Sequence, residues 1–152
     1  MPVIAVVDTN IWISAFINPD GHSARVVEAA RQKRFDLVIS RPLEDELSQV
    51  IMRPRVLKVR NLSPDLAGRF ARNIIGLAAH VDITGDLHLC RDAGDDMVLE
   101  TALNGRATHI VSRDGDLVRS LDLMQQLLTH GIRAITVSHF LREIGTAKPS
   151  FS

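Results

Sequence analysis

The feature that most constrains the fold is a short apolar run near the N-terminus that a carboxylate ends. Residues Val3–Val7 form an uninterrupted run rich in β-branched side chains, and Asp8 follows it directly. Such a run is typical of a strand covered on both faces, as in a parallel sheet. Parallel α/β sheets bind ligands just beyond the carboxyl ends of their strands. The segment therefore predicts an α/β fold with an acidic residue at the ligand-binding edge.

The rest of the chain alternates between helical and strand patterns. Residues 40–52 and 63–79 both have apolar side chains at helical spacing, which predicts a helical hairpin. In its second helix, the stripe Leu66, Phe70, Ile74 and Leu77 is expected to face inward. Further helices are expected over 23–34, 95–104 and 140–144, and further strands over 37–39, 81–83, 108–112 and 134–137.

This alternation predicts right-handed crossovers and a three-layer α/β/α domain with a central parallel sheet and an inserted helical hairpin. No repeat or long linker divides the chain of 152 residues. We expect one domain over residues 1–145 and a flexible tail over 146–152.

Composition excludes several classes of protein. Eighteen basic and eighteen acidic side chains cancel, so the overall charge gives no sign of a nucleic-acid partner. The single cysteine, Cys90, cannot form an internal disulfide or a multi-cysteine zinc site. The apolar start is too short for a signal peptide or a membrane span. We expect a cytoplasmic protein that makes no use of a membrane.

Several acidic residues are expected to meet at the carboxyl edge of the sheet. Asp8 follows the first strand, and Asp114 lies two residues beyond the strand that ends at Ser112. At 100° per residue, Asp95 lies on the apolar side of its helix, whereas Glu100 lies outside that stripe.

The helix that begins near Ser40 supplies another acid to this edge. Periodicity places Asp45 on its solvent side, while Glu44 and Glu46 flank the apolar stripe. The helical pattern alone does not choose between Glu44 and Glu46.

Carboxylates crowded at one edge repel one another, and a divalent cation would relieve that repulsion. Mg²⁺ and Mn²⁺ accept carboxylate oxygens, bind phosphate and lower the pKa of an attacking water. Taken singly, each acid has a structural interpretation: Asp8, Asp92 and Asp95 as helix caps, and Asp114 as a turn residue. Their shared location favours phosphodiester hydrolysis.

Three segments resemble the PIN domain (PilT N-terminus) family: VVDTNIWISAF, SRPLEDELSQVIMRP and RDAGDDMVLETALNGRATHIVSRDGDL. The resemblance is closest to bacterial toxin components of toxin–antitoxin systems, and it extends to the final ITVSHFLREI. It implies a PIN-like fold and a metal-dependent endoribonuclease acting on single-stranded RNA. It also implies an antitoxin protein as partner and a homodimer.

The same resemblance assigns residues to the site. Asp8, Glu46, Asp95 and Asp114 match the acidic positions of the family, so the resemblance favours Glu46 over Glu44. Polar positions that resemble supporting residues are Thr9, Asn10 and Ser112, and further metal-site candidates are Asp96 and Asp116. Asp92 is interpreted as a solvated loop charge.

The most basic stretch of the chain lies between the two helices of the hairpin. It contains Arg53, Arg55, Lys58 and Arg60, which either guide an RNA backbone or form an ordinary solvated surface. Two other functions remain open. Asp114 and Asp116 could be the aspartyl pair of a phosphatase, or the protein could bind RNA without cutting it.

Overall fold

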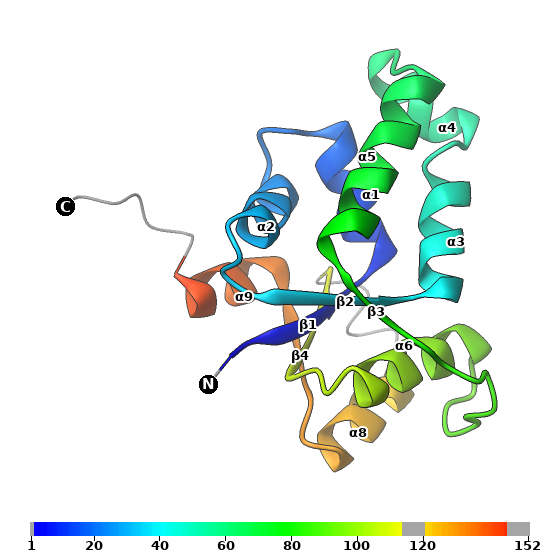
Figure 1. Ribbon diagram of the computed structural model, residues 1–152, viewed down its shortest axis with the longest axis vertical. Helices are drawn as coiled ribbons and strands as arrows, with labels where there is room; N and C mark the ends of the chain where they lie inside the picture. The colour runs from blue at the N-terminus through cyan, green and yellow to red at the C-terminus, as the bar shows by residue number, and fades with distance from the viewer. Residues whose placement is uncertain (1, 114–120, 146–152) are drawn as a thin grey trace.

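The computed structural model describes residues 2–113 and 121–145, and within them one parallel sheet forms the centre of the molecule (Figure 1). The strands follow the order β3-β2-β1-β4-β5, and every neighbouring pair is parallel. This confirms the predicted α/β class. The strands are β1 (Ile4–Val7), β2 (Asp36–Ser40), β3 (Ala79–Val81), β4 (His109–Ser112) and β5 (Arg133–Thr136).

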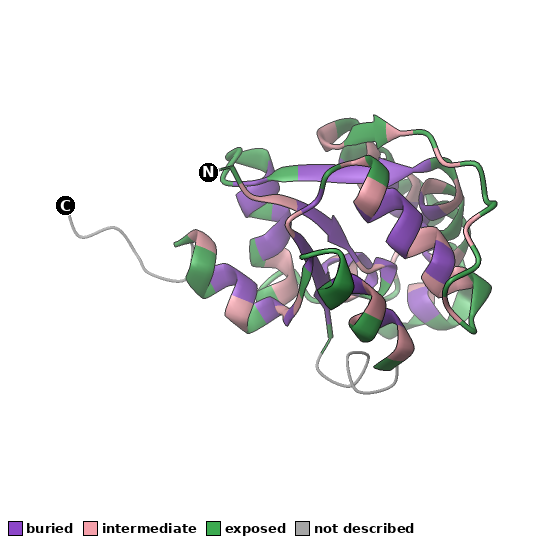
Figure 2. Ribbon diagram, turned by 90° about the horizontal axis from the view of Figure 1, so that it is seen from below, coloured by how far each residue is buried: buried purple, intermediate pink, exposed green. Residues whose placement is uncertain are grey.

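Helices cover both faces of the sheet and make the predicted three layers (Figures 1 and 2). One apolar core lies between the sheet and helices α1, α2, α5 and α9, and a second lies between the sheet and helices α6 and α8. The described helices are α1 (Thr9–Ile17), α2 (His22–Arg31), α3 (Arg41–Val50), α4 (Pro54–Leu57), the 3₁₀ turn η1 (Lys58–Arg60), α5 (Pro64–Leu77), α6 (Ala93–Asn104), α8 (Leu121–Thr129) and α9 (Val137–Ile144).

The strand order changes direction at β1, which places a ligand-binding crevice between β1 and β4. From β1 the chain proceeds outward to β2 and β3, and then crosses to β4 and β5 on the other side of β1. The two central strands pair in register, with Val7 opposite Val111. The Asp8 N–H donates to the Val111 carbonyl oxygen at 3.0 Å. Asp8 therefore lies at the switch point, where open α/β sheets bind ligands.

The helical hairpin lies between β2 and β3, as predicted, and consists of α3, α4, η1 and α5. The predicted inward stripe of α5 is wrong at its start, because Leu66 is 48% exposed. Ala67, Ala71 and Ile74 are buried instead. These residues also follow helical spacing, and the small alanines allow α5 to pack closely on its neighbours.

Helix α6 buries a carboxylate that its periodicity places outside the apolar stripe. Glu100 is 7% exposed and accepts hydrogen bonds from the backbone N–H and hydroxyl of Thr84 and from the N–H of Gly85. Burial alone would raise the pKa of Glu100, but these hydrogen bonds lower it overall. The expectation for Glu100 was wrong because the loop between β3 and α6 folds back over that face of the helix.

Other boundaries shift by a few residues. Strand β3 begins at Ala79 and ends at Val81, where a strand over 81–83 was expected. No helix with a residue range was predicted at the positions of α1 and α8. In the described part of the chain, no helix is long and apolar enough to cross a membrane. The predicted tail over 146–152 lies outside the described residues.

Candidate active site

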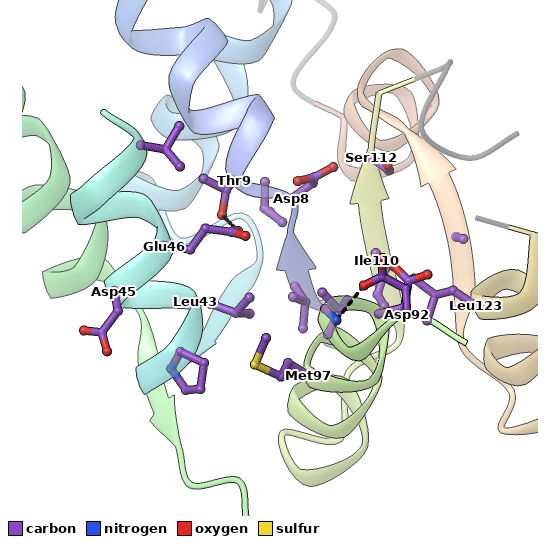
Figure 3. A pocket seen from close by; sticks show the side chains of 18 of the residues that line it. Asp8, Thr9, Leu43, Asp45, Glu46, Asp92, Met97, Ile110, Ser112 and Leu123 are labelled. Carbon is purple, nitrogen blue, oxygen red and sulfur yellow. Dashed lines mark hydrogen bonds between the residues drawn. The ribbon is translucent and has the colours of Figure 1, made fainter. Parts of the chain in front are cut away.

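A cleft of about 540 Å³ opens at the carboxyl ends of β1 and β4 (Figure 3). Its walls come from the start of α1, one face of α3, the first turns of α6, and α8. Three of the predicted acidic residues, Asp8, Glu46 and Asp95, line it together. These residues are far apart in the sequence, so the crossovers of the sheet bring them to one place.

Asp8 both caps helix α1 and lines the cleft. It is the N-cap of α1, and its Oδ1 accepts a hydrogen bond from the Asn10 N–H at 3.2 Å. Its carboxylate also lines the cleft close to the end of β4 (Figure 3). A cap uses only part of the accepting capacity of a carboxylate, so the two roles are compatible.

The structure separates Glu46 from Glu44, which the helical pattern left open. Glu46 lines the cleft, and its Oε1 accepts a hydrogen bond from the Thr9 hydroxyl at 2.5 Å (Figure 3). Glu44 instead contacts His80 on β3, with Oε2 2.8 Å from Nδ1. Asp45 also contributes to the cleft wall, but its carboxylate pairs with Arg41. The structure thus places Glu46 at the cleft, as the family resemblance implied.

Asp95 lies in the first turn of α6 and lines the cleft, half-buried, as its helix angle predicted. Burial raises its pKa, and the negative charges of Asp92, Asp122 and Asp96 raise it further. Asp92 is the N-cap of α6 and accepts from the Gly94 N–H at 2.6 Å. Several negatively charged carboxylates therefore lie close together at this site.

Asp92 is more than the solvated loop charge that we expected. It lines the cleft as well as capping α6. A Cβ at position 94 would approach the Asp92 Oδ1 to 2.9 Å, so a side chain there would displace the capping carboxylate slightly.

Asp96 does not join the residues that line the cleft. It is 6% exposed, and its Oδ1 accepts from the N–H groups of Leu89 and Cys90. The hydrogen bond from the Cys90 N–H is the main cause that lowers the pKa of Asp96. Asp96 thus fixes the loop before α6.

The remaining site candidates divide between the cleft and other places. Thr9 and Ser112 are buried and line it, whereas Asn10 is exposed and does not. Asp114 and Asp116 lie outside the described residues. Burial, with the charges of Asp96 and Asp122, raises the pKa of the Cys90 thiol to about 12, so that this residue is a poor nucleophile.

The four basic candidates have different surroundings. Arg53 lines the cleft. Arg55 and Lys58 are exposed and are not part of the cleft wall. The Arg60 guanidinium donates to the carbonyl oxygen of Ile17 at 3.0 Å, which ties η1 to the end of α1. Arg60 therefore has a structural contact that its sequence context did not indicate.

Sequence reasoning missed two parts of the cleft. Gln49 lines it one turn after Glu46. An apolar part of the wall is formed by Leu123, Met124 and Leu127 of α8. Leucines at positions 121, 123, 127 and 128 carry the helical periodicity that could have revealed α8.

No cluster of three acidic, histidine or cysteine side chains within residues 2–113 and 121–145 is compact enough to hold a metal ion. Mg²⁺ often binds protein through one or two carboxylates and keeps several waters. Asp8, Glu46 and Asp95 each bring a carboxylate to this cleft, so one or two of them would suffice for a hydrated divalent cation.

Comparison with known proteins agrees with this geometry. The chain is 22% identical over 140 residues to the uncharacterized protein MJ1680 of Methanocaldococcus jannaschii. The aligned region covers 91% of this chain and 89% of the relative. The model of the PIN domain family matches residues 4–116, which include every predicted acidic position of the site. The chain therefore belongs to the PIN domain family, and its activity class is that of a nuclease.

Proposed function

We propose that this protein is a Mg²⁺- or Mn²⁺-dependent endoribonuclease. The observation that carries the proposal is the convergence of Asp8, Glu46 and Asp95 on one cleft at the switch point of the sheet. Single-stranded RNA is the proposed substrate because the chain resembles the ribonuclease toxins of the PIN family. Asp114, which comes two residues after Ser112 in the sequence, is the proposed fourth acid.

In this mechanism, carboxylates among Asp8, Glu46 and Asp95 would hold a hydrated cation, and the cation would bind the scissile phosphate. A bound divalent cation would lower the pKa of an attacking water and offset the charge of the phosphate. Thr9 donates to Glu46 and fixes the orientation of that carboxylate. Ser112 is a buried hydroxyl at the end of β4 that supports the same edge.

The electrostatics of the cleft support a cation site. Asp95 has a raised pKa because it is partly buried beside other carboxylates. Without a cation, the ionised form of Asp95 is disfavoured by these neighbours. A divalent ion would favour the ionised form, so metal binding and deprotonation of the site are expected to be coupled.

The decisive experiment is an RNA cleavage assay with three metal conditions. The purified protein is incubated with single-stranded RNA in Mg²⁺, in Mn²⁺ and in chelator, beside Asp8→Asn. The proposal predicts internal cleavage with either metal, none in chelator, and a loss of about a hundredfold or more in the variant. Hydrolysis of p-nitrophenyl phosphate without RNA cleavage would instead favour a phosphatase, and RNA binding alone would favour an inactive protein.

We further propose that the protein is the toxin of a toxin–antitoxin pair. This rests on the resemblance of the whole chain to that branch of the family, which also suggests a homodimer. Expression of the wild-type protein should arrest growth, whereas expression of Asp8→Asn should not. Co-expression of the neighbouring gene product should restore growth and yield a stable complex; equal growth with wild type and variant would contradict the toxin role.

A further inference from the structure

A positive charge lies among the carboxylates of the cleft. Among the described residues that line it, Arg53 is the single cation, and it shares the wall with Asp8, Glu46 and Asp95. The Arg53 side chain is exposed, and within the described chain it forms no hydrogen bond or ion pair. A guanidinium at the wall of an acidic cleft, without a protein partner in the described chain, is available to an anionic ligand.

Arg53 lies just beyond the C-terminal end of α3, where it is the N-cap of α4. Glu46 and Gln49 are about one turn apart on α3, and both line the cleft together with Arg53. The cleft wall therefore includes an acidic group and a neutral amide on α3 and a cation between α3 and α4. A phosphodiester chain that places one phosphate at the carboxylates would bring a neighbouring phosphate toward the arginine.

The other cations near the hairpin are arranged differently. Arg41 on α3 pairs with Asp45, and Arg60 binds the carbonyl oxygen of Ile17. Arg55 and Lys58 are exposed but lie outside the cleft wall. The contacts thus distinguish Arg53 from its neighbours in a stretch where the sequence alone ranks them equally.

We propose that Arg53 binds a backbone phosphate of the RNA strand in the cleft, next to the phosphate that is cut. This inference rests on the proposed ribonuclease function, because it takes RNA as the occupant of the cleft. Contact with phosphate supplies affinity and positions the strand without reading its sequence. A planar guanidinium can form two parallel hydrogen bonds to a phosphate, which an ammonium group cannot.

The test measures RNA binding separately from cleavage. Affinity for a short fluorescein-labelled oligouridylate is measured by fluorescence anisotropy with Mg²⁺ over a series of KCl concentrations. All proteins carry Asp8→Asn, so that the RNA stays intact. The added substitutions are Arg53→Ala, Arg53→Lys and, as a matched control, Arg25→Ala, which removes an exposed arginine of α2 outside the cleft. Thermal unfolding of each variant verifies that it is folded.

The proposal predicts that Arg53→Ala weakens binding roughly tenfold, as expected for loss of a charge-assisted contact. The slope of log K against log[KCl] should become shallower by about 0.7, the value for one phosphate contact to a single strand. Arg53→Lys should restore the slope and only part of the affinity. Arg25→Ala should leave both unchanged.

Two results would overturn this assignment: equal binding by Arg53→Ala and its parent, or an equal loss with Arg25→Ala. Failure of the Asp8→Asn parent to bind the RNA measurably would also overturn it. Failure of the ribonuclease proposal is distinct from these results. It would be seen as absence of metal-dependent cleavage by the protein with Asp8 intact, while the dependence of binding on Arg53 persisted.

Discussion

Glu44 and Glu46 are two residues apart on α3, and their side chains have separate surroundings. Glu46 lines the cleft and receives the Thr9 hydroxyl, whereas Glu44 meets His80 at β3. At 100° per residue, side chains two positions apart leave a helix on nearly opposite sides. Their hydrogen-bonding partners therefore distinguish Glu46 from Glu44, which the apolar pattern of α3 could not do.

This difference provides a matched pair of substitutions. Glu46→Gln should lower the rate of RNA cleavage by about a hundredfold or more, because it removes a charged ligand of the proposed cation. Glu44→Gln keeps the shape of a side chain outside the cleft and should cleave at the wild-type rate. Slower cleavage by Glu44→Gln than by Glu46→Gln would show that Glu44, and not Glu46, belongs to the site.

Thr9 offers a second prediction at this scale. Thr9→Val keeps the side-chain shape but removes the hydroxyl that orients Glu46. Loss of such an orienting contact typically weakens metal binding by about 10- to 100-fold. The Mg²⁺ concentration for half-maximal cleavage should therefore rise, and Thr9→Ser should restore it. An unchanged Mg²⁺ requirement would show that the hydrogen bond does not position the carboxylate.

The loop between β3 and α6 is held by carboxylates of the neighbouring helices α6 and α8. Glu100 holds Thr84 and Gly85, Asp96 holds Leu89 and Cys90, and Asp122 of α8 accepts from the Arg91 N–H. These acceptors connect the loop to the helix that carries Asp95. Helical periodicity describes only packing against the core, so it does not predict contacts made by a returning loop.

Loss of the Glu100 contacts should destabilise the protein. Glu100→Ala leaves the N–H groups of Thr84 and Gly85 without their acceptor, and the free energy of unfolding should fall by about 2–3 kcal/mol. Urea unfolding measures this change, with Glu28→Ala as control for an exposed glutamate of α2. A loss equal to that of the control would mean that the loop does not depend on this anchor.

For the whole molecule, the alternation of strands and helices was sufficient to predict the fold class and the hairpin, and the ends of the strands predicted where Asp8 would lie. Helix angle also placed Asp95 correctly. The choice of Glu46, the wall formed by α8 and the burial of Glu100 depend on tertiary contacts between segments distant in sequence. Single-segment periodicity carries no information on such contacts, so only family resemblance favoured Glu46 in advance, and the other two features emerged from the three-dimensional arrangement.

Acid should destabilise the folded state through carboxylates on both sides of the sheet. Hydrogen bonds lower the folded-state pKa of Asp96 and Glu100; for Glu143, burial raises it, and the contacts of Arg133 and His109 lower it overall. A depressed folded pKa means that the unfolded chain binds protons more readily. Stability is then complete above the unfolded carboxyl pKa and is lost as the pH falls through the folded values.

Urea unfolding at a series of acidic pH values measures this dependence. Glu143 contacts Arg133 at 2.7 Å and His139 at 3.0 Å, so it links α9 to β5. Glu143→Gln removes one titrating group and should flatten the acid-side decline while lowering stability at neutral pH. A decline as steep as that of wild type would show that Glu143 does not contribute to it.

The central claim is that Asp8, Glu46 and Asp95 form one metal-dependent site for cutting RNA. Its most direct measurement is the rate of single-stranded RNA cleavage as Mg²⁺ or Mn²⁺ is titrated, for wild type and for Asp8→Asn, Glu46→Gln and Asp95→Asn. The account predicts metal-dependent cleavage by wild type and a large loss in each variant, with their folds intact. Cleavage that persists in chelator, or that survives all three substitutions, would contradict it.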